Sequence, residues 1–115
     1  MKLQNHEQAV VAERKIVNYL LDETHPTGKH KAAFFKRFGF DVEKWTLLES
    51  ALRRHAADHE VASTLETDEG IHYVVEGELQ TPDERNPHVR CVWAIDTGSD
   101  TPRFITAYPL DKGSI

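Results

Sequence analysis

The sequence predicts an α+β fold, with three N-terminal helices packed on one face of a four-stranded antiparallel sheet. Up to about residue 60 the apolar residues recur at the three- to four-residue spacing of amphipathic helices. After Glu60 the spacing falls to two, and β-branched and aromatic residues gather in short runs bounded by turn residues. The links between these runs are polar and short enough for consecutive antiparallel pairing, which favours a meander.

The first helix is expected to carry the apolar stripe between Val10 and Leu21, with Asn5 as a plausible N-cap. The turn at His25 to Gly28 should end it. Pro26 disfavours a helical conformation at the residue before it, and a glycine permits a tight turn.

Two further helices follow this turn. One is expected over Lys29 to Phe38, capped by Thr27 and stopped by the glycine after it. The other is expected from Val42 to about His59, with Asp41 as its N-cap.

The second half of the chain should form the sheet. The predicted strands are Val61 to Glu66, Ile71 to Leu79, His88 to Asp96 and Arg103 to Tyr108. Trp93 is expected in the core, buried against Trp45 or the Phe34–Phe38 face, because its neighbours at two-residue spacing are apolar. The helical part, about 5–60, and the sheet part, about 61–110, are predicted to form a single domain over residues 1–115.

The charge of the chain is acidic overall but unevenly distributed. A formal net charge of -5 argues against a general nucleic-acid binder, which neutralises phosphates with Lys and Arg. Three segments nevertheless lack acidic residues and contain basic ones: Thr24 to Phe40, Arg85 to Ile95 and Thr101 to Leu110. They predict a local positive patch near the second helix and the last two strands.

Other features bound the class of protein. No apolar run approaches the roughly 20 residues of a membrane helix, and the N-terminus lacks the apolar core of a signal peptide, so a cytoplasmic protein is expected. A lone cysteine, Cys91, excludes an internal disulfide. His55 and His59 have a metal-binding spacing, but no third ligand is evident, and solvent-facing histidines near a helix end are expected instead. No metal or cofactor is predicted.

Two segments resemble an uncharacterised bacterial domain family. The first, His25 to Phe35, reads HPTGKHKAAFF and is followed by FGF and a helix containing Trp45 and Leu48. The second comprises CVWAI around Trp93 and the closing PRFITAYP from Pro102 to Pro109. The resemblance covers about residues 15 to 110. That family is itself similar to ribonuclease toxins of the barnase–EndoU–colicin–RelE superfamily.

This resemblance implies metal-independent RNA cleavage on an antiparallel sheet, often neutralised by a small antitoxin or immunity partner. RNA rather than DNA is the expected partner, because the attacking group is the 2′-hydroxyl. The candidate catalytic residues are His25, Lys29, His30, Arg103 and Tyr108. The candidate RNA- or phosphate-binding residues are Lys31, Arg90 and Thr106. Imidazoles can act as base or acid, with the choice between His25 and His30 left open, and the cations can stabilise the phosphorane.

Strand alternation complicates this site, because it places Thr106 and Tyr108 on one face and Arg103 on the other unless a β-bulge intervenes. Glu76 and Glu78 form either a carboxylate pair for acid–base catalysis or part of the solvent-exposed face of the sheet. Two alternative functions remain. One is a non-catalytic binding or partner-recognition domain of the same fold. The other is an immunity-like subunit with apolar residues such as Phe104 exposed in an interface.

Overall fold

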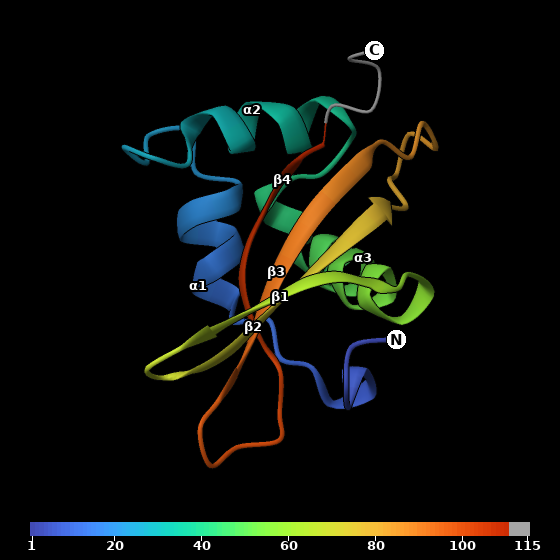
Figure 1. The fold of residues 1–115 in the computed structure, drawn as a ribbon. Helices are drawn as coiled ribbons and strands as arrows, with labels where there is room; N and C mark the ends of the chain where they lie inside the picture. The colour runs from blue at the N-terminus through green and yellow to red at the C-terminus, as the bar shows by residue number, and fades with distance from the viewer. Residues whose placement is uncertain (111–115) are drawn as a thin grey trace.

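The computed structural model describes residues 1–110 and has the predicted α+β architecture (Figure 1). The helical segments are η1 (His6–Gln8), α1 (Glu13–Lys15), the π-helical η2 (Ile16–Leu20), α2 (Lys29–Arg37), η3 (Val42–Lys44) and α3 (Trp45–Asp58). The strands are β1 (Val61–Thr67), β2 (Gly70–Glu78), β3 (His88–Asp96) and β4 (Arg103–Pro109). Each strand lies within a residue of its predicted bounds.

The four strands form one antiparallel sheet in the order β1-β2-β3-β4, which confirms the meander. One face of the sheet meets the helices: Val75, Cys91 and Ala107 are paired neighbours on three strands, and all are fully buried. The residues between them point to the opposite face, because side chains alternate along a strand. We call this opposite side of the sheet the open face.

The helices and the inner face of the sheet share one apolar core. Ile16 and Leu20 of η2, Phe35 of α2 and Leu52 of α3 are all completely buried within it. Figure 1 shows α3 behind the sheet, with α1 and α2 alongside β4. Burial raises the pKa of the Cys91 thiol, so this cysteine is an unreactive core residue.

Trp93 lies in this core, as predicted. Its side chain is 0% exposed, and its ring meets Phe104 edge to face with centroids 5.4 Å apart. The expectation that Phe104 is exposed in an interface is wrong, because Phe104 pairs with Trp93 across β3 and β4 and is buried.

A bulge in β4 decides which residues share the open face. Val92 pairs with Thr106, whereas the next residue, Trp93, pairs with Phe104, so Ile105 is the extra residue. The bulge shifts the alternation, and Arg103 pairs with Ala94 on the same face as Thr106. Arg103, Thr106 and Tyr108 therefore all belong to the open face.

The first helix is shorter than predicted. It begins at Glu13, and Val10 instead forms a parallel bridge with Arg103, donating to Pro102 O at 2.9 Å and accepting from Phe104 N at 2.9 Å. Asn5 is not its cap: it adopts a left-handed conformation before η1, and its amide donates to Asp100 O. Pairing with an edge strand satisfies more backbone groups around Val10 than another helical turn at a frayed end would.

Asp41 does act as a cap, but for η3: its carboxylate accepts from Glu43 N at 2.7 Å, and α3 follows from Trp45. The histidines at the other end of α3 depart from expectation. His55 is 2% exposed, and its Nε2–H donates to Gly77 O at 3.1 Å and Val89 O at 3.0 Å. It ties α3 to β2 and β3 rather than facing solvent.

Burial predicts acid sensitivity at His55. Desolvation, reinforced by the neighbouring His59, lowers its pKa from 6.5 to about 4. The unfolded chain therefore binds the proton first, and stability is lost as the pH falls from about 6.5 through 4. Integrated over this window, the loss approaches roughly 3 kcal/mol.

Urea unfolding between pH 7.5 and 4 tests this expectation. His55→Gln, which retains a side-chain N–H, should be less stable at pH 7 but should lose less stability on acidification than the wild type. Equal slopes in the two proteins would contradict it. The carboxylates whose pKa values are lowered in the folded chain, such as Asp96 beside Arg103, also reduce the stability on acidification. They do so at more acidic pH than His55.

Candidate functional site on the open sheet face

One cross-strand row on the open face contains three functional groups. Glu76 of β2 pairs with Arg90 of β3, and Arg90 pairs with Tyr108 of β4. The Arg90 Nε donates to the Glu76 carboxylate at 2.5 Å, and the Arg90 Nη1 lies 3.4 Å from the Tyr108 hydroxyl. This polar row, as we name Glu76, Arg90 and Tyr108, results directly from strand register.

The environment of the row suits chemistry at a charged centre. The side chains of Arg90 and Glu76 are 36% and 30% exposed, so the pair is neither buried nor fully solvated. The guanidinium also lies over the Tyr108 ring, 5.6 Å from its centroid. Hydrogen bonds to Tyr108 and Glu76 raise the pKa of Arg90, which fixes a positive charge between an acceptor and a donor.

Arg103 lies further along the same face and is engaged elsewhere. Its guanidinium makes two hydrogen bonds to Asp96, at 2.7 and 3.0 Å, in a bidentate pair. The bond to Asp96 raises the pKa of Arg103. Two strand steps of about 6.8 Å each separate its position from the row, so the structure places Arg103 at the margin of the site.

A pocket of about 540 Å³ opens beside β4, next to Thr106. Tyr19 of η2 lines it, and its hydroxyl forms a 2.9 Å hydrogen bond with Thr106 Oγ1. The residues that line it are Arg14, Lys15, Asn18, Tyr19, His25, Thr27, Ile105 and Thr106. None is acidic, which agrees with a local positive patch on an acidic chain.

Cations surround the phenol of Tyr19. The ammonium groups of Lys31 and Lys15 lie 5.3 and 5.8 Å from its ring centroid. Burial raises the pKa of Tyr19, but hydrogen bonds with Thr106 and Lys31, together with the two positive charges, outweigh it and lower the pKa. The pocket therefore favours negative charge.

His25 shapes one wall of this Tyr19 pocket. Its Nδ1 accepts from Thr27 N at 3.1 Å and Gly28 N at 3.0 Å, so the proton of the neutral ring is on Nε2. The predicted capping by Thr27 is replaced by this imidazole, and Gly28 is the N-cap of α2. With Nδ1 occupied and Nε2 protonated, neutral His25 can donate to a ligand but has no free lone pair to act as a base.

Gly28 allows the His25 turn to lie against Tyr19. A Cβ at position 28 would be 2.8 Å from the Tyr19 carbonyl oxygen and 2.9 Å from its ring. The His25 ring then meets the Tyr19 ring edge to face, with centroids 5.0 Å apart.

The predicted residues thus separate into groups. Arg90 and Tyr108 meet in the row, and His25, Lys31 and Thr106 meet around Tyr19. Lys29 and His30 are exposed on the first turn of α2, and no side-chain hydrogen bond or ion pair within residues 1–110 joins them to either group. Across those residues, no three His, Cys, Asp or Glu side chains could hold a metal ion together.

Sequence reasoning missed Tyr19, Arg14 and Lys15, because they belong to a helix interpreted as a core element. The sequence signal that could have revealed these residues was a cluster of polar side chains just before Ile16 and between Ile16 and Leu20. Glu76 was recognised only as one of two alternating carboxylates. Its pairing with Arg90 depends on the β2–β3 register.

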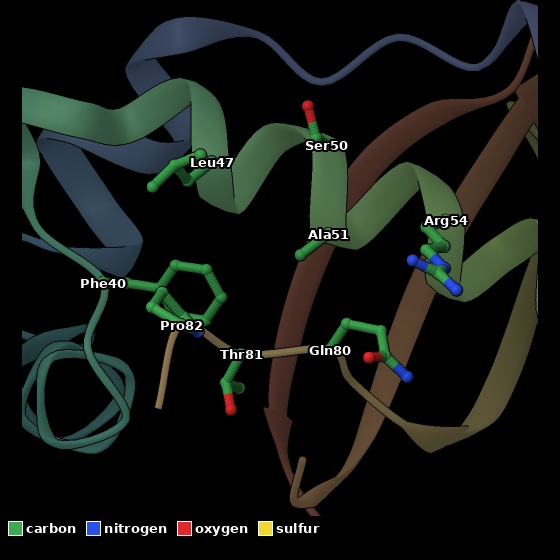
Figure 2. A pocket seen from close by; sticks show the side chains of 8 residues that line it. All are labelled: Phe40, Leu47, Ser50, Ala51, Arg54, Gln80, Thr81 and Pro82. Carbon is green, nitrogen blue, oxygen red and sulfur yellow. The ribbon is translucent and has the colours of Figure 1, made fainter. Parts of the chain in front are cut away.

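A second hollow, of about 270 Å³, is lined by none of the residues of the row or of the Tyr19 pocket (Figure 2). It lies between the start of α3 and residues 80–82, with Phe40, Leu47 and Pro82 around it. Arg54 lines it too, but pairs with Asp58 at 3.2 Å. This lining is mainly apolar and offers no acid–base pair.

These observations define an α+β domain with a polar site on an open antiparallel sheet. The chain belongs to the domain of unknown function DUF6883, a family whose sequence model matches residues 2–111. No curated protein matches the sequence.

Among solved structures, the fold is similar to a chain of a contact-dependent growth inhibition toxin–immunity protein complex from Klebsiella pneumoniae 342. The TM-score is 0.68 at 16% identity, over 88% of this chain and 99% of that one. No helix in the described part of this chain could cross a membrane.

Proposed function

We propose that the chain is a metal-independent ribonuclease of the toxin type, with Glu76, Arg90 and Tyr108 as its catalytic centre. The observation that carries the proposal is their row, in which three strands hold a carboxylate, a guanidinium and a phenol in succession. Cleavage through the 2′-hydroxyl needs a proton acceptor, a positive charge beside phosphorus and a proton donor.

Each group has one role in this scheme. Glu76 takes the proton of the 2′-hydroxyl while that oxygen bonds to phosphorus. Arg90 stabilises the negative charge on the phosphorane oxygens, and the P–O5′ bond breaks as Tyr108 gives its proton to the leaving oxygen. The products are a 2′,3′-cyclic phosphate and a 5′-hydroxyl, and solvent returns the protons to their starting groups.

The structural neighbour lends support to a toxin or immunity-like role, since it is a chain of a toxin–immunity protein complex. By the same analogy of fold, a small antitoxin or immunity protein is the expected partner of this chain. RNA is the proposed substrate because the mechanism uses its 2′-hydroxyl.

Purified protein, free of any partner, should cleave RNA in the presence of EDTA and leave 2′,3′-cyclic phosphate ends. The ends can be identified by their resistance to ligation and by mass spectrometry of the fragments. An all-2′-deoxy version of the same oligonucleotide should remain intact. Cleavage of that DNA, or cleavage abolished by EDTA, would contradict the mechanism.

A non-catalytic binding domain is the second candidate, favoured by one observation. Arg90 and Arg103 are both already paired with carboxylates, Glu76 and Asp96, in the ligand-free chain. A domain that only binds would retain these pairs. It would bind RNA without cleaving it, and its expression without a partner would not inhibit growth.

A further inference from the structure

We infer that the Tyr19 pocket is a second phosphate subsite, which holds the phosphate adjacent to the scissile one in single-stranded RNA. The inference rests on the proposed function for the identity of the ligand. The pocket itself stands on geometry: it is open, has a volume of about 540 Å³, and contains basic side chains without an acidic one.

The donors in the pocket are suited to a phosphate dianion or diester. Arg14 makes no ion pair within residues 1–110, and Lys15 uses one hydrogen to bond Ile105 O at 3.0 Å, leaving its charge unneutralised. His25 can donate through Nε2–H, because its Nδ1 is held by two backbone N–H groups. Lys31 adds a further positive charge above the Tyr19 ring.

The Tyr19 pocket lies close to the polar row along β4. Thr106, which bonds Tyr19, and Tyr108, which ends the row, are two residues apart on the same face of β4. That separation is about 6.8 Å along a strand, which is of the order of one nucleotide step in an extended chain. A strand of RNA with one phosphate at Arg90 can therefore reach the pocket with its neighbour.

The substrate is accordingly an oligonucleotide that carries at least two phosphates. Duplex RNA is disfavoured, because its phosphates lie along an A-form helix, whereas a splayed single strand can follow β4. Electrostatic attraction of this kind should depend strongly on salt.

The affinity arm of the test uses Glu76→Gln as background, in which cleavage is slowed by about 10²- to 10⁴-fold, and a fluorescein-labelled hexaribonucleotide as probe. Adding Arg14→Gln and Lys31→Gln should weaken binding about 10-fold or more at 50 mM salt. It should also reduce the slope of log K against log salt by about 0.7, which is the contribution of one phosphate contact on a single strand. Adding Lys44→Gln and Arg54→Gln instead removes the same charge near α3 and should change neither quantity.

The kinetic arm compares a trinucleoside diphosphate with a dinucleoside monophosphate. The wild type should prefer the longer substrate by roughly 10-fold in kcat/KM, and the Arg14→Gln/Lys31→Gln variant should lose that preference. If no RNA is cleaved, the proposed function fails while the affinity arm still decides on the pocket. Equal affinities and salt slopes in the pocket and α3 variants would overturn the subsite even if cleavage is observed.

A titration with inorganic pyrophosphate separates RNA from a free anion. Amide resonances of Gly28 and Thr106 should shift with the oligonucleotide at lower concentration than with pyrophosphate. Shifts with pyrophosphate alone would assign the pocket to a small soluble anion and overturn the RNA assignment.

Discussion

Replacing Glu76 with Gln should lower the rate of RNA cleavage by about 10²- to 10⁴-fold, the range expected when a general base is lost. The substitution preserves shape and a carbonyl oxygen that can still accept from the Arg90 Nε. The fold and the position of Arg90 should therefore change little. Single-turnover rates on a fixed oligoribonucleotide, together with the free energy of unfolding, measure the two effects separately.

Glu78→Gln is the matched control for this prediction. Glu78 lies two residues further along β2 on the same face and is exposed, so the same charge is removed outside the row. Its cleavage rate should stay within a few-fold of the wild type. Similar losses in the two variants would mean that the net charge of the face matters and that Glu76 has no specific role.

For the remaining polar residues, the loss of cleavage rate on substitution should decrease with distance from the row. Arg90→Ala is expected to cost 10² to 10³ in rate, because it removes the charge beside phosphorus and leaves Glu76 unpaired. Arg103→Ala should cost less, since Arg103 is bound to Asp96 at the margin. His25→Ala should act mainly by loosening the turn that its Nδ1 holds.

The strands could be predicted from the sequence because alternation of apolar and polar residues is a local signal. The site depended on features that this signal does not contain. The bulge at Ile105 places Arg103 on the face of Thr106, and nothing in the PRFITAYP segment distinguishes the bulged residue from its neighbours. The row likewise depends on the register between β2 and β3, which Glu76 and Arg90 do not reveal by spacing alone.

The N-terminal segment was harder to predict for a similar reason. Val10 continues the apolar stripe of the helix, yet it pairs with Arg103, far away in the chain. Tyr19 has the spacing of a core residue, and its hydroxyl meets Thr106 only because η2 lies beside β4. His25 was chosen for its chemistry, whereas its Nδ1 proved to have a structural role. Contacts between residues distant in sequence decide the first two cases, whereas the His25 Nδ1 bonds are local, to the backbone N–H groups of Thr27 and Gly28.

Trp93→Ala should be the most destabilising single substitution in the sheet, at about 3–5 kcal/mol. The side chain is completely buried, and its removal leaves a cavity against Phe104 that β-sheet pairing prevents from closing. Domains of this size have free energies of unfolding of about 5–15 kcal/mol, so the variant should retain only a small part of its stability. Urea unfolding followed by far-ultraviolet circular dichroism provides the measurement, because it does not depend on the lost fluorophore.

Trp93→Phe provides the comparison that identifies the cause. The indole Nε1–H is buried without a hydrogen-bond partner among the described residues, so replacing it with a phenyl ring removes an unsatisfied donor while keeping most of the apolar volume. We expect this variant to lose less than half as much stability as Trp93→Ala. RNA affinity per folded molecule should be the same in both variants and the wild type, because Trp93 faces the helices and not the open face. A selective loss of RNA binding with unchanged stability would instead place Trp93 at the nucleic-acid surface and contradict the assignment of the two faces of the sheet.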